Sequence, residues 1–224
     1  MKIIKFEKID STNNYLKGLK KPKEDVVAIA DEQTGGRGSK GRSFSSLRGG
    51  VYLSALKLNP CKAADSFTIM ENAALAVCRT LSAFGIEGGI KWPNDVFVNG
   101  KKICGILIEN VFGGDMVTRS VTGIGLNVNN PLPAELKEIA TTMKEVAGKE
   151  FSVQTVRATL VYNLFLTPSA EEYKRRSLVL GKEIKIIKPD GTEYFGVAED
   201  VLPNGNLLLK GGEVLSSAEV SIVI

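Results

Sequence analysis

Residues 30–44, the glycine loop, bring glycines and cationic side chains together in a pattern that could bind phosphate. Four glycines alternate with three cations along it: Gly35, Gly36, Arg37, Gly38, Lys40, Gly41 and Arg42. Glycine lets the backbone approach a ligand closely, and exposed N–H groups beside Arg and Lys form a concave anion site. We expect this segment to become ordered around a phosphate-bearing ligand. The alternative is a flexible loop with solvated cations.

Three further clusters carry polar side chains that could contact a small molecule. Asp10–Asn14 offers donors and acceptors suited to an uncharged polar ring, although the same residue types are favoured as helix N-caps. Lys91–Asp95 holds the single tryptophan of the chain, and its Pro-Asn-Asp also favours a turn. Lys102 opens an apolar run and is expected to be partly enclosed. The segment 123–128 places two glycines and Asn127 at the end of a strand, where glycine marks a close approach.

Composition narrows the chemistry that these residues could perform. The chain has 224 residues, 43% of them hydrophobic, and a net charge of +4, which argues only weakly for anionic ligands. It contains no histidine, which excludes Ser-His and Cys-His catalysis and His-ligated metals. Three cysteines without a CxxC pair argue against a disulfide framework and fit a reducing cytoplasm. We find no signal peptide and no apolar run of about 18 residues, so we expect a cytoplasmic protein without membrane contact.

Hydrophobic periodicity and turn residues predict the elements that position these clusters. The expected strands are residues 3–9, 26–30, 51–58 (closed by Pro60), 86–90, 96–98, 102–109 and 117–128. The expected helices are residues 14–20, 66–84, 136–146 and 152–173, the last interrupted by Pro168 and ending at the solvated pair Arg175 and Arg176. The glycine loop would then join two neighbouring strands. Asn99-Gly100 predicts a tight hairpin turn that brings Asp95 and Lys102 toward each other.

After residue 178 the sequence pattern changes from long predicted helices to short predicted strands. Short predicted strands at residues 182–187, 193–201, 207–210 and 220–224 are separated by glycine-containing turns. About 45 residues are too few to be comfortably stable alone. We therefore divide the chain into a main domain, residues 1–178, and a small β-barrel, residues 179–224, that docks on it.

Two nucleotide-binding motifs come close to this sequence and fail. Gly36–Ser43 differs from a P-loop at one position, where Arg42 replaces the lysine, but no helical pattern follows to bind the phosphates. No Gly-x-Gly-x-x-Gly follows the first strand and opens a helix, which excludes a dinucleotide fold.

The clusters together resemble the biotin–protein ligases, of the short form without an N-terminal DNA-binding domain. The matching segments, in family order and spacing, are Asp10–Asn13, Asp31–Thr34, Gly36–Arg42, Lys91–Asp95, Lys101–Glu109 and Gly123–Val128. Each motif alone is weak, but the ordered set is specific. The resemblance implies an α+β fold, with a mixed central sheet and flanking helices like a class II synthetase, and a small SH3-like domain.

The resemblance also implies a two-step reaction. ATP with Mg²⁺ would adenylate the biotin carboxylate to biotinyl-5′-AMP, and a lysine of a biotin carboxyl carrier protein would then attack the mixed anhydride. This chemistry needs positioning and charge stabilisation and no enzyme nucleophile, which agrees with the absent histidine. No tightly bound cofactor and no DNA binding are expected, and the oligomeric state stays open, with a homodimer as one option.

The family roles transfer to residues of this chain by position. Lys102 and Arg37 would be catalytic, and Asp95 would contact Mg²⁺ through water. The implied biotin-binding residues are Ser11, Thr12, Asn13, Gln33, Gly36, Arg37, Gly38, Ser39, Lys102 and Gly105. The implied ATP-binding residues are Lys40, Arg42, Phe44, Trp92, Asn94, Asp95 and Asn127.

Two positions depart from the family pattern. Ser39 stands where the family commonly has arginine, which removes one cation, and Phe44 stands where tryptophan is common, which removes an indole N–H. Two other functions stay open. A lipoate–protein ligase has related chemistry, but the absence of histidine and of that family's Arg-x-x-Gly-Gly-Gly stretch counts against it. A non-catalytic biotin-binding protein is disfavoured because Lys102, Asp95 and Asn127 are retained.

Overall fold

The structure is a computed structural model that describes residues 1–223. Its centre is a seven-stranded sheet with the order β1-β2-β3-β7-β6-β5-β4. These strands are β1 (Lys2–Ile9), β2 (Val26–Gln33), β3 (Val51–Lys62), β4 (Gly89–Lys91), β5 (Asp95–Val98), β6 (Lys101–Gly113) and β7 (Met116–Leu126). β1 and β2 run parallel, whereas the other neighbouring pairs run antiparallel. The expected α+β fold with a mixed sheet is confirmed.

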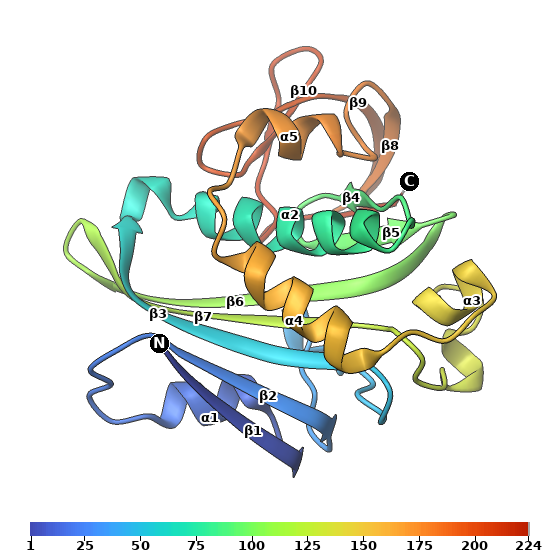
Figure 1. The fold of residues 1–224 in the computed structure, drawn as a ribbon. Helices are drawn as coiled ribbons and strands as arrows, with labels where there is room; N and C mark the ends of the chain where they lie inside the picture. The colour runs from blue at the N-terminus through green and yellow to red at the C-terminus, as the bar shows by residue number, and fades with distance from the viewer. Residues whose placement is uncertain (224) are drawn as a thin grey trace.

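Helices cover both faces of this sheet (Figure 1). The helices α2 (Phe67–Ala83) and α4 (Val153–Leu164) pack on one face, and α1 (Thr12–Gly18) packs on the other. Residues 26–30 of strand β2 are all apolar, because Val27 and Ile29 face the first core while Val26 and Ala28 face the second. Burial of both faces explains why this strand reads as a continuous apolar run.

The turn between β5 and β6 forms as the sequence predicts. Asn99 and Gly100 both have positive φ, 50° and 77°, as a type I′ turn requires. Asp95 pairs with Gly105 across the hairpin. The glycine loop likewise joins β2 and β3, which are neighbours in the sheet.

Two expectations about the main domain were wrong. Strand β3 does not end at Pro60 but continues to Lys62 through an irregularity between Leu58 and Cys61, where a proline costs no ladder hydrogen bond. The predicted helix 136–146 is largely absent. After a short 3₁₀ turn, Ala134–Leu136, the backbone at Ile139 and Thr141 pairs with Lys102, and helix α3 spans only Met143–Ala147.

The predicted helix 152–173 is two separate helices, because α4 ends at Leu164 and α5 (Ala170–Arg175) begins after Pro168. The prediction that both arginines at the end of α5 are solvated is correct for Arg175 and wrong for Arg176. Arg175 is exposed, but Arg176 donates to Glu172 at 3.2 Å.

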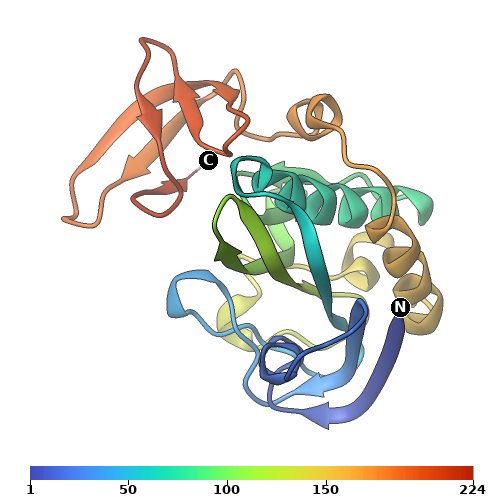
Figure 2. The same ribbon diagram turned by 90° about the vertical axis from the view of Figure 1, so that its left-hand side faces the viewer.

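The C-terminal segment forms a separate antiparallel sheet that packs against the main domain (Figure 2). Its order is β11-β10-β9-β8-β12, with β8 (Glu183–Ile187), β9 (Glu193–Val201), β10 (Leu207–Leu209), β11 (Val214–Leu215) and β12 (Ser221–Val223). The predicted last strand, 220–224, reaches Ile224, which lies outside the described residues. The buried residues of the C-terminal sheet, Ile184 and Ile186 among them, belong to the same apolar cluster as α2. The expected docking of this sheet on the main domain is therefore confirmed. The boundary between residues 178 and 179 stays a prediction.

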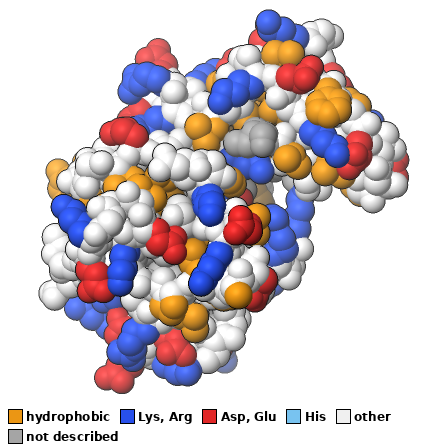
Figure 3. Space-filling view, turned by 90° about the vertical axis from the view of Figure 1, so that its right-hand side faces the viewer, with side chains coloured by type: hydrophobic (Ala, Val, Ile, Leu, Met, Phe, Trp, Pro, Cys, Tyr) orange, Lys and Arg blue, Asp and Glu red, His pale blue; other side chains and the backbone are white. Residues whose placement is uncertain are grey.

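Acidic and basic side chains are interspersed over the face shown in Figure 3. Among residues 1–223 the structure contains no helix that is both long and apolar enough to cross a bilayer.

Candidate active site

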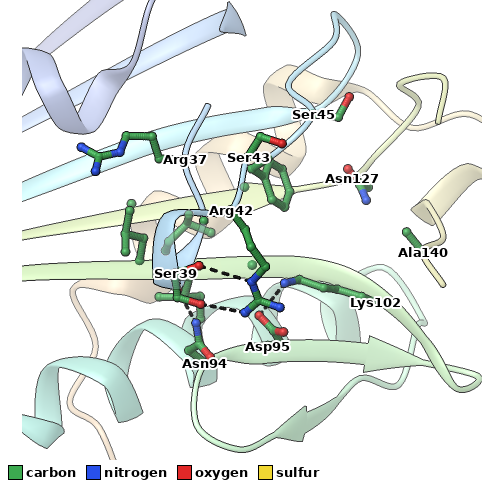
Figure 4. A pocket seen from close by; sticks show the side chains of 18 of the residues that line it. Arg37, Ser39, Arg42, Ser43, Ser45, Asn94, Asp95, Lys102, Asn127 and Ala140 are labelled. Atoms are coloured by element: carbon green, nitrogen blue, oxygen red, sulfur yellow. Dashed lines mark hydrogen bonds and ion pairs between the residues drawn. The ribbon is translucent and has the colours of Figure 1, made fainter. Parts of the chain in front are cut away.

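A cavity of about 490 Å³ lies between the glycine loop, the start of α1, strands β5 to β7 and residues 132–140. It collects most of the residues that the sequence singled out. Lining residues from the predicted biotin set are Ser11, Thr12, Asn13, Gln33, Arg37, Gly38, Ser39, Lys102 and Gly105. Lining residues from the predicted ATP set are Arg42, Phe44, Asn94, Asp95 and Asn127. Segments more than 100 residues apart in the chain therefore meet here, and Figure 4 shows several of these side chains together.

One end of the cavity is a buried network of uncharged polar groups. Ser11 caps α1 by accepting from the Asn14 N–H at 3.4 Å, so the N-cap interpretation is confirmed, while Thr12 and Asn13 line the cavity. The Oε1 atom of Gln33 accepts from the Thr12 N–H at 2.9 Å and lies 3.0 Å from the Thr12 hydroxyl. Thr12, Asn13 and Ser11 are 5% exposed or less. Such a network is suited to a small ring that carries both donors and acceptors.

The other end of the cavity is charged. The Nζ atom of Lys102 lies 2.7 Å from Oδ1 of Asp95, as the hairpin predicted. Lys91 lines the same end, and burial lowers the pKa of its ammonium group. Arg42 points toward Asp95 and Lys102 in Figure 4, and its guanidinium donates to the Ser39 hydroxyl at 3.0 Å and to the Ser39 carbonyl at 3.3 Å. Lys91, Lys102 and Arg42 outnumber the lining carboxylates Asp95 and Glu138, which leaves a net positive charge that would attract phosphate groups.

The aromatic ring of Phe44 forms part of the floor between these two ends. It lies over the pair Gly105 and Gly125, which face each other on β6 and β7. A Cβ atom at Gly105 would come within 3.2 Å of the ring, and one at Gly125 would come closer still. The two glycines therefore let an aromatic ring, and by extension a flat ligand, rest directly on the sheet.

The glycine loop has a defined shape of its own. It closes on itself through hydrogen bonds from the Phe44 N–H to the Gly36 carbonyl at 2.9 Å and from the Gly38 N–H to the Arg42 carbonyl at 2.7 Å. The side chain of Lys40 also reaches the C-terminal sheet, where it donates to the Val220 carbonyl at 2.8 Å. Ordering upon ligand binding stays a prediction, but the loop is held at three points without a ligand.

Three predicted site residues lie outside the cavity wall. Gly36 is buried and serves the loop closure. Lys40 points to the start of β12, where its Nζ also donates to the Ser221 hydroxyl at 3.3 Å. Trp92 is 4% exposed, and its Nε1–H donates to the Gly205 carbonyl at 2.9 Å, so its ring packs at the junction with the C-terminal sheet. These placements do not support direct ligand contacts by Gly36, Lys40 or Trp92.

Asn94 and Asn127 line the cavity, but their side-chain amides form hydrogen bonds to backbone carbonyls of the fold. The Nδ2 atom of Asn94 donates to the Ile106 carbonyl at 2.8 Å, and that of Asn127 donates to the Thr141 carbonyl at 3.1 Å. Oδ1 of Asn127 accepts from Asn130 at 3.1 Å. Both side chains thus hold the wall in shape.

Sequence reasoning missed several lining residues. Ser54 is fully buried on β3, and a serine within an apolar strand was a signal that could have found it. Lys91 lies in the matching segment Lys91–Asp95, but it is among neither the predicted biotin-binding nor the predicted ATP-binding residues. The apolar rim formed by Leu132, Leu136 and Ile139 had no signal, because it follows from the irregular backbone beside Lys102.

The two buried thiols play no part in this site. Burial raises the pKa of Cys78 to about 12 and raises that of Cys104 well above its ordinary value. A thiol that stays protonated is a poor nucleophile, and Cys78 is a packing residue of the main apolar cluster.

The donor set near Asp95 fits a metal that arrives with a nucleotide better than a resident ion. Residues 1–223 contain no group of three or more His, Cys, Asp or Glu side chains able to hold a metal. One carboxylate beside cations that attract phosphate is the arrangement that suits Mg²⁺, which is usually held by one or two carboxylates plus substrate phosphates.

Comparison with known proteins places the chain in a family. Residues 5–129 match the model of the biotin/lipoate A/B protein ligase family. The Bifunctional ligase/repressor BirA of Bacillus subtilis is 34% identical over 211 residues, which cover 85% of this chain and 63% of that protein. The biotin–[acetyl-CoA-carboxylase] ligase of Mycobacterium tuberculosis is 29% identical over 204 residues, covering 84% of this chain and 74% of that protein. The chain spans just under two thirds of the length of two Bacillus relatives, 63% and 66%.

A solved structure agrees over nearly the whole chain. The biotin protein ligase of Aquifex aeolicus, determined in complex with biotin and ATP, superposes with a TM-score of 0.81 at 30% identity and covers 99% of this chain and 98% of that chain. The family model, the relatives and the shared fold agree with the motifs that converge on the cavity. The chain belongs to the biotin/lipoate A/B protein ligase family.

Proposed function

We propose that this protein is a biotin–protein ligase, which uses ATP to form biotinyl-5′-AMP and then transfers biotin to a lysine of a biotin carboxyl carrier protein. One observation supports this proposal above all: a single cavity joins a buried polar network at Thr12 and Gln33 to a cationic end at Lys102 and Arg42. A ureido ring and a phosphate need opposite surroundings, and both are available within about 490 Å³.

The first step joins the carboxylate to the nucleotide. A carboxylate oxygen of biotin attacks the α-phosphorus of ATP, the bond between the α-phosphorus and the bridging oxygen breaks, and pyrophosphate leaves. Both reactants are anions, so their repulsion increases as they approach. Lys102, 30% exposed and already paired with Asp95, is placed to neutralise both sets of oxygens. Arg42 and Lys91 would attract the β- and γ-phosphates.

The second step breaks the mixed anhydride. The neutral ε-amine of a carrier lysine attacks the acyl carbon, a C–N bond forms, the C–O bond to phosphate breaks and AMP leaves, while the amine loses a proton. In the first step, before pyrophosphate leaves, Asp95 would contact through water a Mg²⁺ ion that accompanies ATP, and the ion would neutralise phosphate charge. A cytoplasmic location, where ATP and such carriers occur together, is part of the proposal.

The experiment that tests this proposal is ATP–pyrophosphate exchange in the presence of biotin or lipoate, before any carrier is added. Exchange that depends on biotin alone is expected, because the adenylation residues are complete without a carrier. Exchange with lipoate instead would identify a lipoate ligase. Binding of biotin without any exchange would identify a non-catalytic biotin-binding protein.

A further inference from the structure

Glu109 lies behind the polar end of the cavity and is not among its lining residues. Its carboxylate accepts a hydrogen bond from Nδ2 of Asn13 at 3.0 Å and one from Nζ of Lys17 at 2.6 Å. Asn13 is 5% exposed, and the side chain of Glu109 is 24% exposed. A carboxylate on β6 that does not line the cavity thus contacts the wall residue Asn13.

Glu109 is ionised at neutral pH. Burial acts to raise the pKa of this carboxyl, but the hydrogen bonds from Lys17 and Asn13, together with the charges of Lys17 and Arg37, leave the pKa below its ordinary value. The positive charges that face it are those of Lys17 on α1 and Arg37 on the glycine loop. An ionised carboxylate accepts hydrogen bonds and donates none.

This charge sets the direction of the hydrogen bonds that follow. Because Glu109 only accepts, Asn13 must turn its NH₂ group toward Glu109 and its Oδ1 atom toward Ser54. The Ser54 hydroxyl, at 2.5 Å, then donates to Asn13 and has no second proton. Because Ser54 has no proton left for Thr12, the single hydroxyl proton of Thr12 is donated either to the Ser54 oxygen at 2.7 Å or to Oε1 of Gln33 at 3.0 Å.

The row of hydrogen-bonded side chains Asn13, Ser54 and Thr12 therefore presents lone pairs to the cavity. The protons of Ser54 and Thr12 are drawn into the protein, which leaves their oxygens as acceptors toward a ligand. A ring with N–H donors, such as the ureido ring of biotin, satisfies them. A ring that offers only acceptors leaves them unpaired, and such a mismatch in a buried site is costly.

We propose that Glu109 is a positioning residue that fixes the direction of the Asn13–Ser54–Thr12 hydrogen-bond chain and so selects a ligand ring bearing N–H donors. This inference rests on the proposed function, because it names biotin as the ligand. It extends that function by assigning ring selection to a carboxylate that does not touch the ligand.

The test measures pyrophosphate exchange with two substrates: biotin, and a carbamate analogue in which oxygen replaces one ureido N–H. Glu109→Gln keeps the size of the side chain but can donate as well as accept, so the chain of hydrogen bonds can reverse. The matched control is Glu32→Gln, because Glu32 also pairs with a lysine at 2.6 Å and is 26% exposed. We expect Glu109→Gln to raise the KM for biotin about tenfold, to change kcat less than about twofold, and to reduce the preference for biotin over the analogue about tenfold, the scale of one buried hydrogen bond. Glu32→Gln should change none of these.

Several results would overturn the inference. An unchanged preference for biotin in Glu109→Gln, with normal exchange in the parent, would remove Glu109 from ring selection and leave the proposed function intact. Equal losses of exchange with both substrates, together with lower melting temperature, would show a purely structural role. No biotin-dependent exchange in the parent would overturn the proposed function, and this inference with it.

A second variant guards against misfolding of the first. Lys17→Met leaves Glu109 in place but removes its nearest cation, so the pKa of the carboxyl should rise. The KM for biotin should then begin to increase at a higher pH than in the parent as the pH is lowered. Coincident pH profiles would contradict the role of the Glu109 charge.

Discussion

Lys102 and Asp95 form an ion pair across the β5–β6 hairpin, with Nζ 2.7 Å from Oδ1, at the charged end of the cavity. Asp95 lies opposite Gly105 in the ladder, and the type I′ turn at Asn99-Gly100 holds the two strands in register. A lysine that already has a carboxylate partner is held in position before any phosphate arrives. The ion pair therefore preorganises the charge that the proposed adenylation step requires.

Replacing Lys102 tests this charge. Lys102→Met should lower the rate of biotin-dependent pyrophosphate exchange about 10²-fold or more, the scale reported for lost electrostatic groups in active sites. The melting temperature should stay near that of the parent. Lys101→Met is the matched control, because the neighbouring lysine binds the Lys137 carbonyl and does not line the cavity. Parental exchange rates in Lys102→Met would exclude Lys102 from the reaction.

The tether of Lys40 predicts that the C-terminal sheet restrains the glycine loop. Lys40→Ala removes the hydrogen bond to the Val220 carbonyl, so trypsin should cleave after Arg37 and Arg42 several-fold faster in the ligand-free protein. Biotin with ATP should slow cleavage in both proteins, because ordered segments resist proteolysis. Lys210→Ala, at an exposed lysine that follows β10, provides the control. Identical cleavage in the Lys40 and Lys210 variants would show that the tether does not restrain the loop.

Trp92 is predicted to act on stability and not on nucleotide binding. Trp92→Phe leaves the buried Gly205 carbonyl without its indole donor, which should lower the free energy of unfolding by about 1–3 kcal/mol. The KM for ATP should stay within about twofold of the parent. Urea unfolding and exchange kinetics on the same protein separate the two effects. A large rise in KM with unchanged unfolding would restore the nucleotide contact that the family resemblance implies.

Glu172 predicts a pH-dependent contribution to stability at α5. Its carboxylate accepts from Arg79 at 2.5 Å and from Arg176 at 3.2 Å. The hydrogen bond from Arg79, aided by Arg176, lowers the pKa of Glu172 below its ordinary value of 4.5. The native state thus binds this proton more weakly than the unfolded state, so the stabilisation is present above pH 4.5 and is lost as the pH falls through the lowered pKa.

The variant Glu172→Gln should lower the free energy of unfolding by about 1.5–3 kcal/mol at pH 7, the range for hydrogen bonds to charged groups. The difference from the parent should shrink as the pH falls below 4.5. Urea titrations at pH 7 and pH 3.5 measure both values. Glu171→Gln, on an exposed neighbour in the same helix, should be neutral at each pH. A constant difference at both pH values would mean that the charge of Glu172 does not matter.

The sequence by itself determined the elements whose signals are local. Hydrophobic periodicity located α2, the β5–β6 turn followed from Asn99-Gly100, and the N-cap at Ser11 followed from its side chain. Motif order also predicted polar residues of the cavity wall, because Thr12, Gln33, Asp95 and Lys102 are recognisable by type and spacing.

Only the tertiary structure decided which of these side chains face the cavity. Trp92 and Lys40 belong to matching segments yet turn toward the C-terminal sheet, because Gly205 and Val220 offer carbonyls there. Glu109 and Ser54 gain their roles from partners 96 and 41 residues away in the chain. A local pattern specifies how a segment folds, whereas the direction of a hydrogen bond between distant segments depends on packing that no single segment encodes.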